Sequence, residues 1–231
     1  MFKETIIKYA GIDYSGRKSL NDAENIKIFN GFSEDLKNRL NCAILFSDES
    51  NDQINQRIAS NIEIIGKENE VGFILGGKDY PFHSTLLEGL FEGIQVSDRE
   101  KIFKEIIESG EFKENIQNLS GIQIQFKYIL IDKENVLLTS TDMPEEIERV
   151  RLELGHIYEK CGLKPIKMKN ILHLSIARIS KLPQNKEEAL KNYKKDMIGL
   201  RHKISSDPII LEVSAVSFKS AYDLLTSNNI K

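Results

Sequence analysis

Two short stretches of this 231-residue chain place a histidine two positions before a serine or a threonine. They are His83-Ser84-Thr85 and His173-Leu174-Ser175. Because side chains two residues apart on a strand share a face, each stretch is predicted to present an imidazole beside a hydroxyl. Two imidazoles suit phosphodiester cleavage near neutral pH, since a neutral one removes a proton from the attacking oxygen and a protonated one supplies a proton to the leaving oxygen.

The two hydroxyls have a separate predicted task. Thr85 and Ser175 can donate hydrogen bonds to the non-bridging oxygens of a phosphate held between His83 and His173. The sequence leaves open which histidine is the base and which the acid. It also leaves open a structural or interaction protein in which both tripeptides are accidental.

The elements that must position these residues alternate between strand and helix patterns. Strands are predicted at 41–46, 71–75, 82–87, 121–131, 136–138, 170–178 and 209–218, and helices at 53–65, 97–109, 145–160 and 185–203. Gly76-Gly77-Lys78-Asp79 predicts a turn that joins 71–75 and 82–87 as a hairpin. The pattern indicates an α+β fold built from two similar halves.

The strand around His173 has a clear division of faces. Leu172, Leu174 and Ile176 share one face and are predicted to pack inward, which leaves His173 and Ser175 pointing towards a cleft. Strict alternation places Arg178 on the face opposite His173 unless the strand bends or ends first.

Composition sets the wider bounds. The chain carries 32 Lys and Arg against 35 Asp and Glu, so no global positive field draws it to duplex nucleic acid. No apolar run reaches membrane-spanning length, and Cys42 and Cys161 lack partners at metal-ligand spacing. His156 and His202 also lack partners and are expected to be surface or packing residues. We therefore expect a cytoplasmic protein with no membrane partner, no metal and no cofactor.

The two motifs also carry a family resemblance. His83-Ser84-Thr85-Leu86 and the stretch from His173 to Arg178 resemble the paired H-x-[ST] motifs of the 2H phosphoesterase superfamily, most closely its RNA 2′,3′-cyclic phosphodiesterase (2′-5′ RNA ligase-like) branch. The resemblance covers roughly residues 41–220. It implies a bilobal, LigT-like α+β fold, with two pseudo-symmetric antiparallel-sheet lobes around a central groove.

The resemblance further implies a metal-independent phosphodiesterase that acts on the 2′,3′-cyclic phosphate end of RNA or on cyclic nucleotides. His83 and His173 would be catalytic, Thr85 and Ser175 would bind the phosphate, and Arg178 matches an arginine common after the second motif. Tyr80, beside the first motif, is a further candidate for substrate binding. We expect a monomer with an N-terminal extension, partly helical, over 1–40 and the phosphoesterase-like domain over 41–231. The alternative is a non-catalytic module that binds a nucleotide or an RNA end.

Overall fold

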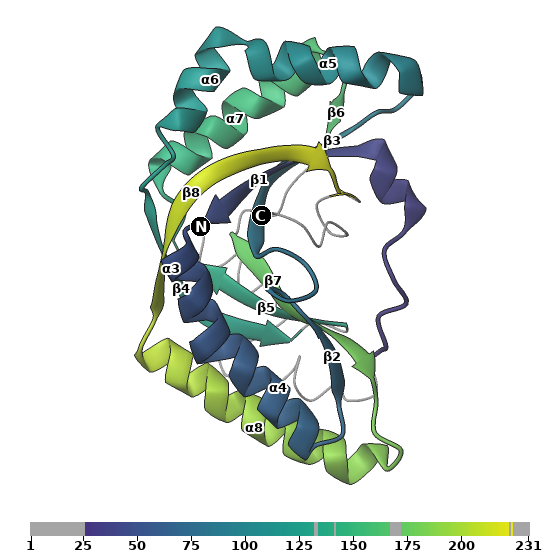
Figure 1. Cartoon of the computed structure of the whole chain (residues 1–231), viewed down its shortest axis with the longest axis vertical. Helices are drawn as coiled ribbons and strands as arrows, with labels where there is room; N and C mark the ends of the chain where they lie inside the picture. Colours follow the sequence, from purple (N-terminus) through teal and green to yellow (C-terminus); the bar gives the residue numbers. More distant parts are fainter. Residues whose placement is uncertain (1–25, 132–133, 141, 167–171, 222, 224–231) are drawn as a thin grey trace.

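The computed structural model describes residues 26–131, 134–140, 142–166, 172–221 and 223 (Figure 1). The expected extension therefore lies mostly outside the described residues. Its described part contains a 3-10 helix, η2 (Glu34–Asn38), and the first strand begins at Arg39. The elements that follow are β1 (Arg39–Phe46), α3 (Asp48–Ile54), the π-helical turn η3 (Asn55–Ala59), α4 (Ser60–Glu68), β2 (Gly72–Leu75), β3 (His83–Leu90), α5 (Val96–Glu108), α6 (Gly110–Gln117), β4 (Gln123–Ile131), β5 (Asn135–Ser140), α7 (Glu145–Lys160), β6 (Lys164–Pro165), β7 (His173–Lys181), α8 (Lys186–Ser206) and β8 (Ile209–Ser220).

Within the described residues, eight strands form one antiparallel sheet in the order β2-β7-β5-β4-β8-β1-β3-β6. β8 joins its two halves, because 209–212 pair with β4 whereas 213–220 pair with β1. Two four-stranded halves result, β2-β7-β5-β4 and β8-β1-β3-β6. The predicted α+β fold with two similar antiparallel halves is confirmed.

The two halves repeat one topology. Each histidine motif opens the strand second from the outer edge of its half, β3 in one and β7 in the other. β1 is the inner neighbour of β3, and β5 is the inner neighbour of β7. The chain thus builds the same local frame twice and places one histidine motif in each.

Helices cover the outer side of each half. α7 packs on β3 beside α6, while α4 packs on β2 and α8 packs on β4. Figure 1 shows α5, α6 and α7 at one end of the molecule and α4 and α8 at the other, with the strands between them. The apolar faces of β1 and β7 supply much of the core, including Ile44, Leu174 and Ile176, each fully buried.

The predicted hairpin of 71–75 and 82–87 is wrong. β2 pairs with β7 and β3 pairs with β1 and β6, so the turn at Gly76-Gly77 carries the chain from one half to the other. Gly76 donates from its backbone N–H to Ile176 O at 2.8 Å, which keeps the turn attached to β7. A local turn pattern shows that the chain reverses, but the strands pair with partners that are distant in sequence and better placed to bury their apolar faces.

Gly77 has a conformation that other residues adopt at a cost. Its φ is +78°, and a Cβ there would lie 2.5 Å from the Phe82 ring. We expect Gly77→Ala to lower the free energy of unfolding by about 2–4 kcal/mol, from left-handed strain and overpacking together. Gly93→Ala is the matched control, since Gly93 has φ +75° and open space around it, and strain alone predicts a loss of about 1–2 kcal/mol. Equal losses in urea unfolding would contradict the packing argument.

Candidate active site

The two motif strands have the same break in their pairing. In β3, Thr85 pairs with Ala43 and Leu87 with Cys42, so Leu86 is an extra residue. In β7, Ser175 pairs with Leu137 and Ala177 with Val136, so Ile176 is the extra one. Each motif is therefore followed, three residues after its histidine, by a β-bulge.

The bulge in β7 decides the direction of Arg178. Arg178 pairs with Asn135 and Ser175 pairs with Leu137, two residues along β5, so both side chains lie on one face. His173 pairs with Thr139 and shares that face. The bulge at Ile176 thus interrupts strict alternation along β7 and brings Arg178 to the face of His173.

The two motifs lie close together in space. β3 and β7 contact each other although they belong to different halves. The Tyr80 hydroxyl, three residues before His83, donates to the carbonyl oxygen of Ser175 at 3.1 Å. The charge of Arg178 also reaches His83 and opposes its protonation. The bond from Tyr80 and the charge of Arg178 thus connect the segment around the first motif to the strand of the second.

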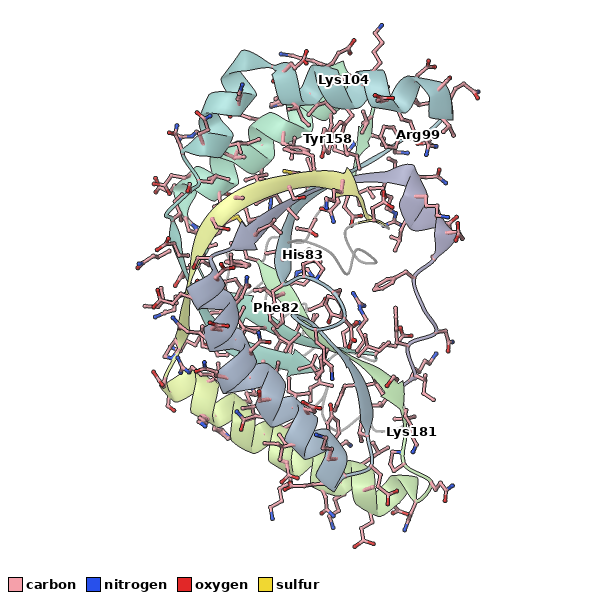
Figure 2. The ribbon with its side chains drawn as sticks, viewed as in Figure 1. Phe82, His83, Arg99, Lys104, Tyr158 and Lys181 are labelled. Carbon is pink, nitrogen blue, oxygen red and sulfur yellow. The ribbon has the colours of Figure 1, made fainter. Side chains whose placement is uncertain are left out.

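His83 is buried at the start of β3, with 9% of its surface exposed. Figure 2 shows it near the middle of the molecule, beside Phe82. Its Nδ1 lies 2.9 Å from the carbonyl oxygen of Pro81, which accepts a hydrogen bond when Nδ1 carries the proton. That tautomer leaves Nε2 as the basic nitrogen. Burial, with a smaller contribution from Arg178, lowers the pKa of His83 to about 4 and keeps the ring neutral at pH 7.

This lowered pKa couples folding to pH. The unfolded chain binds a proton at His83 near pH 6.5 but the folded chain only near pH 4, so the stability from neutral His83 is complete above pH 6.5 and is lost as pH falls towards 4. A shift of one pKa unit corresponds to about 1.4 kcal/mol. Between pH 7 and pH 4 we therefore expect the free energy of unfolding to fall by roughly 3 kcal/mol more in wild type than in His83→Gln. Urea unfolding at pH 7 and pH 4 measures it. His156→Gln, which removes an exposed histidine, is the control for the loss of an imidazole elsewhere. Equal pH dependence in wild type and His83→Gln would contradict a buried neutral His83.

Thr85 shares the face of His83 and has a partner that the sequence did not indicate. The side-chain amide of Asn41 donates from Nδ2 to Thr85 Oγ1 at 3.2 Å. A hydroxyl that accepts this bond retains its own proton for donation. Asn41 is 2% exposed, and its Oδ1 has no hydrogen-bond partner among the described residues. Asn41 therefore orients Thr85 as a hydrogen-bond donor.

In the second half, His173 and Ser175 are half-buried, while Leu172, Leu174 and Ile176 are fully buried, as the alternation predicts. Tyr80, a candidate for substrate binding on the sequence, is buried in the structure. The residue is 3% exposed and its hydroxyl donates to the carbonyl oxygen of Ser175, so its ring offers almost no free face to a nucleobase. Burial raises the pKa of Tyr80, which preserves its hydroxyl as a donor. Tyr80 supports the backbone of the second motif.

The duplicated halves differ in charge five residues after each histidine. The first motif has Glu88 there, which forms an ion pair with Arg39 at 3.1 Å. The second has Arg178, whose Nη1 donates to Asn135 Oδ1 at 2.6 Å. Asn41 and Asn135 occupy matching positions, since each pairs with the fifth residue after its histidine. Repetition of an asparagine ahead of two apolar strands is the sequence signal that could have indicated both.

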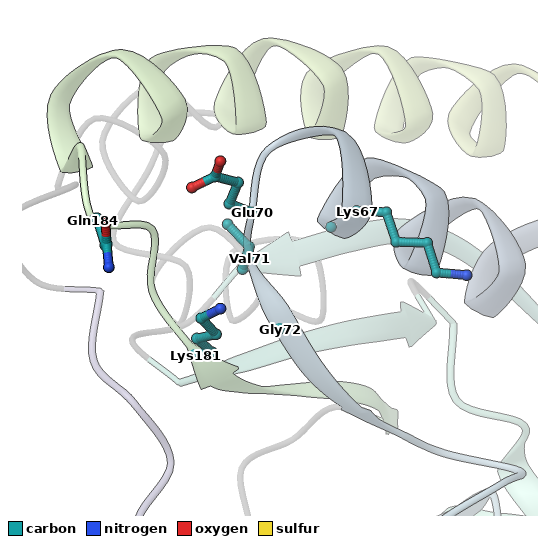
Figure 3. A pocket seen from close by; sticks show the side chains of 7 residues that line it. Lys67, Glu70, Val71, Gly72, Lys181 and Gln184 are labelled. Carbon is teal, nitrogen blue, oxygen red and sulfur yellow. The ribbon is translucent and has the colours of Figure 1, made fainter.

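Other candidate features lie elsewhere. Within the described residues, no group of three or more His, Cys, Asp or Glu side chains is arranged to hold a metal ion, and no helix is long and apolar enough to cross a membrane. His156 is exposed and lies 4.0 Å from Glu159, in agreement with a surface position. A cavity of about 500 Å³ lies where α4 ends and β2 begins (Figure 3). It is lined by Gly66, Lys67, Glu70, Gly72, Lys181 and Gln184, among others, and includes none of the predicted site residues.

Comparison with known proteins gives weak matches. No family model and no curated protein matches the chain. Among solved structures, Usb1 of Kluyveromyces marxianus is 12% identical over 81% of this chain and 96% of its own, with a TM-score of 0.44. A structure of the same protein with uridine monophosphate is 15% identical over 80% and 95%, with a TM-score of 0.48.

Proposed function

We propose that this protein is a metal-independent phosphodiesterase of the 2H phosphoesterase type, which opens 2′,3′-cyclic phosphates on RNA ends or on nucleotides. The observation that carries the proposal is the duplication itself. His83 with Thr85 and His173 with Ser175 occupy matching positions on matching strands, each followed by a bulge at the same distance. Chance tripeptides in a structural protein have no reason to share a strand position, a bulge, and an asparagine paired with the fifth residue after the histidine.

In this proposal the environment of His83 assigns the base role to it. A ring held neutral at pH 7 by burial is in the state that a base requires, and Nε2 is left to accept the proton. Water attacks phosphorus while His83 accepts a proton from it, and one P–O bond of the ring breaks. His173, protonated, donates its proton to the leaving ribose oxygen. The product is a phosphomonoester, and the pair returns to its starting state after a proton is exchanged with solvent.

The hydroxyls of Thr85 and Ser175 then donate to the non-bridging oxygens. Thr85 is prepared for this, because Asn41 occupies its acceptor side. Arg178 supplies positive charge on the face that carries His173, where it would balance the negative charge of the phosphate. Tyr80 acts within the protein, since its bond to the Ser175 carbonyl supports the backbone beside the second hydroxyl.

The experiment is hydrolysis of four 2′,3′-cyclic nucleotides and a short oligonucleotide ending in a cyclic phosphate, in the presence of EDTA. Products are identified by ³¹P NMR. We expect turnover to a monoester that EDTA does not affect. Specific binding of these compounds without turnover would identify the protein as a recognition module instead. The absence of both turnover and binding would refute the enzyme hypothesis and the binding-module hypothesis alike.

A further inference from the structure

Residues 26–32, ahead of η2, lie along the end of β7. The N–H of Phe29 donates to Ile179 O at 2.7 Å, and Ile26 is buried in the core. The Phe29 and Phe32 rings are half-buried and meet edge to face, with centroids 4.9 Å apart. The backbone is thus attached next to Arg178, and the two rings are held beside it.

Arg178 is surrounded by aromatic rings. Its Cζ lies 4.9 Å from the centroid of Phe29, 4.8 Å from that of Phe32 and 5.6 Å from that of Tyr80. Contacts with ring faces attract the cation without consuming its N–H donors. Only the bond from Nη1 to Asn135 uses a donor in the described structure, and Nε is buried with no hydrogen-bond partner among the described residues.

We infer that Phe29 and Phe32 are positioning residues that hold the Arg178 guanidinium ready for a substrate phosphate, so that the segment ahead of β1 is a working part of the site. The inference rests on the proposed function for its consequence in catalysis, but the structural step does not depend on turnover. An arginine side chain free in solvent samples many rotamers, and a ligand must select one of them. Three rings and one amide restrict that choice before the ligand arrives, which lowers the cost of binding.

Two double variants separate ring contacts from simple packing. Phe29→Leu with Phe32→Leu keeps apolar bulk but removes the rings, whereas Phe29→Tyr with Phe32→Tyr keeps the rings. With a 2′,3′-cyclic nucleotide as substrate, we expect the leucine pair to raise KM about tenfold and to change kcat by less than about twofold. The tyrosine pair should remain near wild type.

The same leucine pair in an Arg178→Met background tests whether the effect passes through Arg178. We expect no further rise in KM there, beyond about twofold. An equal rise in both backgrounds, or a leucine pair that behaves like wild type, would overturn the inference.

A measurement without substrate keeps this test separate from the proposed activity. The Arg178 Nε–H, assigned by its loss in Arg178→Met, should give an NMR signal shifted upfield by the rings and protected from solvent exchange. In the leucine pair that signal should move downfield and exchange faster, while in the tyrosine pair it should stay. A signal unchanged by the leucine pair would refute the positioning role even if the enzyme turns over. If the NMR signal changes as expected but the protein does not hydrolyse cyclic phosphates, the proposed function is refuted and the positioning of Arg178 is upheld.

Discussion

Replacement of His83 or of His173 with alanine is expected to lower kcat/KM for a 2′,3′-cyclic phosphate by about 10²–10⁴-fold, the range typical of a lost general acid or base. The reason is that each step of the proposed reaction moves one proton to or from one imidazole. His83 is buried and oriented by the Pro81 carbonyl, and His173 opens the matching strand. Initial rates in EDTA, with folding checked by circular dichroism, measure the loss.

His156→Ala is the matched control for these two variants. It removes an exposed imidazole on α7 whose Nδ1 lies 4.0 Å from Glu159 Oε2. We expect wild-type kinetics. If kcat/KM falls as much in His156→Ala as in His83→Ala, a general loss of folded protein rather than acid–base chemistry explains both results.

Thr85→Val should lower kcat by about 10²–10³-fold, the range measured when one donor to a developing oxyanion is removed. Valine keeps the shape of threonine and loses only the hydroxyl, which Asn41 orients through its 3.2 Å bond. Ser175→Ala should have a similar effect. Steady-state kinetics with the same 2′,3′-cyclic phosphate measure kcat of Thr85→Val and of Ser175→Ala.

Conservative variants distinguish donation from packing at these positions. Thr85→Ser and Ser175→Thr keep the hydroxyl and are expected to retain activity within about tenfold of wild type, because the donor survives with a small change in shape. Thr85→Val with normal kcat, or Thr85→Ser as damaged as Thr85→Val, would contradict a donor role.

The sequence was sufficient to predict most elements of the fold. Helical spacing of Ile147, Val150 and Leu154 predicted α7, and all three are buried. Alternation predicted β4 and the inward face of β7. These patterns are reliable because the burial of one face determines them locally.

Long-range pairing was not predictable in the same way. The turn at Gly76-Gly77 indicates a reversal but not that β2 joins β7, since partner choice depends on the whole sheet. The bulge at Ile176 has no sequence signature of its own, so the direction of Arg178 required the register. Two side-chain contacts also join distant parts of the chain. Asn41 and Thr85 are 44 residues apart, and Phe29 and Arg178 belong to different segments.

The measurement that tests the central claim most directly is kcat/KM of the double variant His83→Ala with His173→Ala beside the two single variants. If both imidazoles act on one phosphodiester, each single variant already disables the unit, and the double variant should fall no more than about threefold below the weaker single variant. If the fold-losses of kcat/KM in the two single variants multiply in the double variant, the two histidines contribute independently. Wild-type activity in either single variant would show that one histidine takes no part, and the two-histidine account would then be wrong.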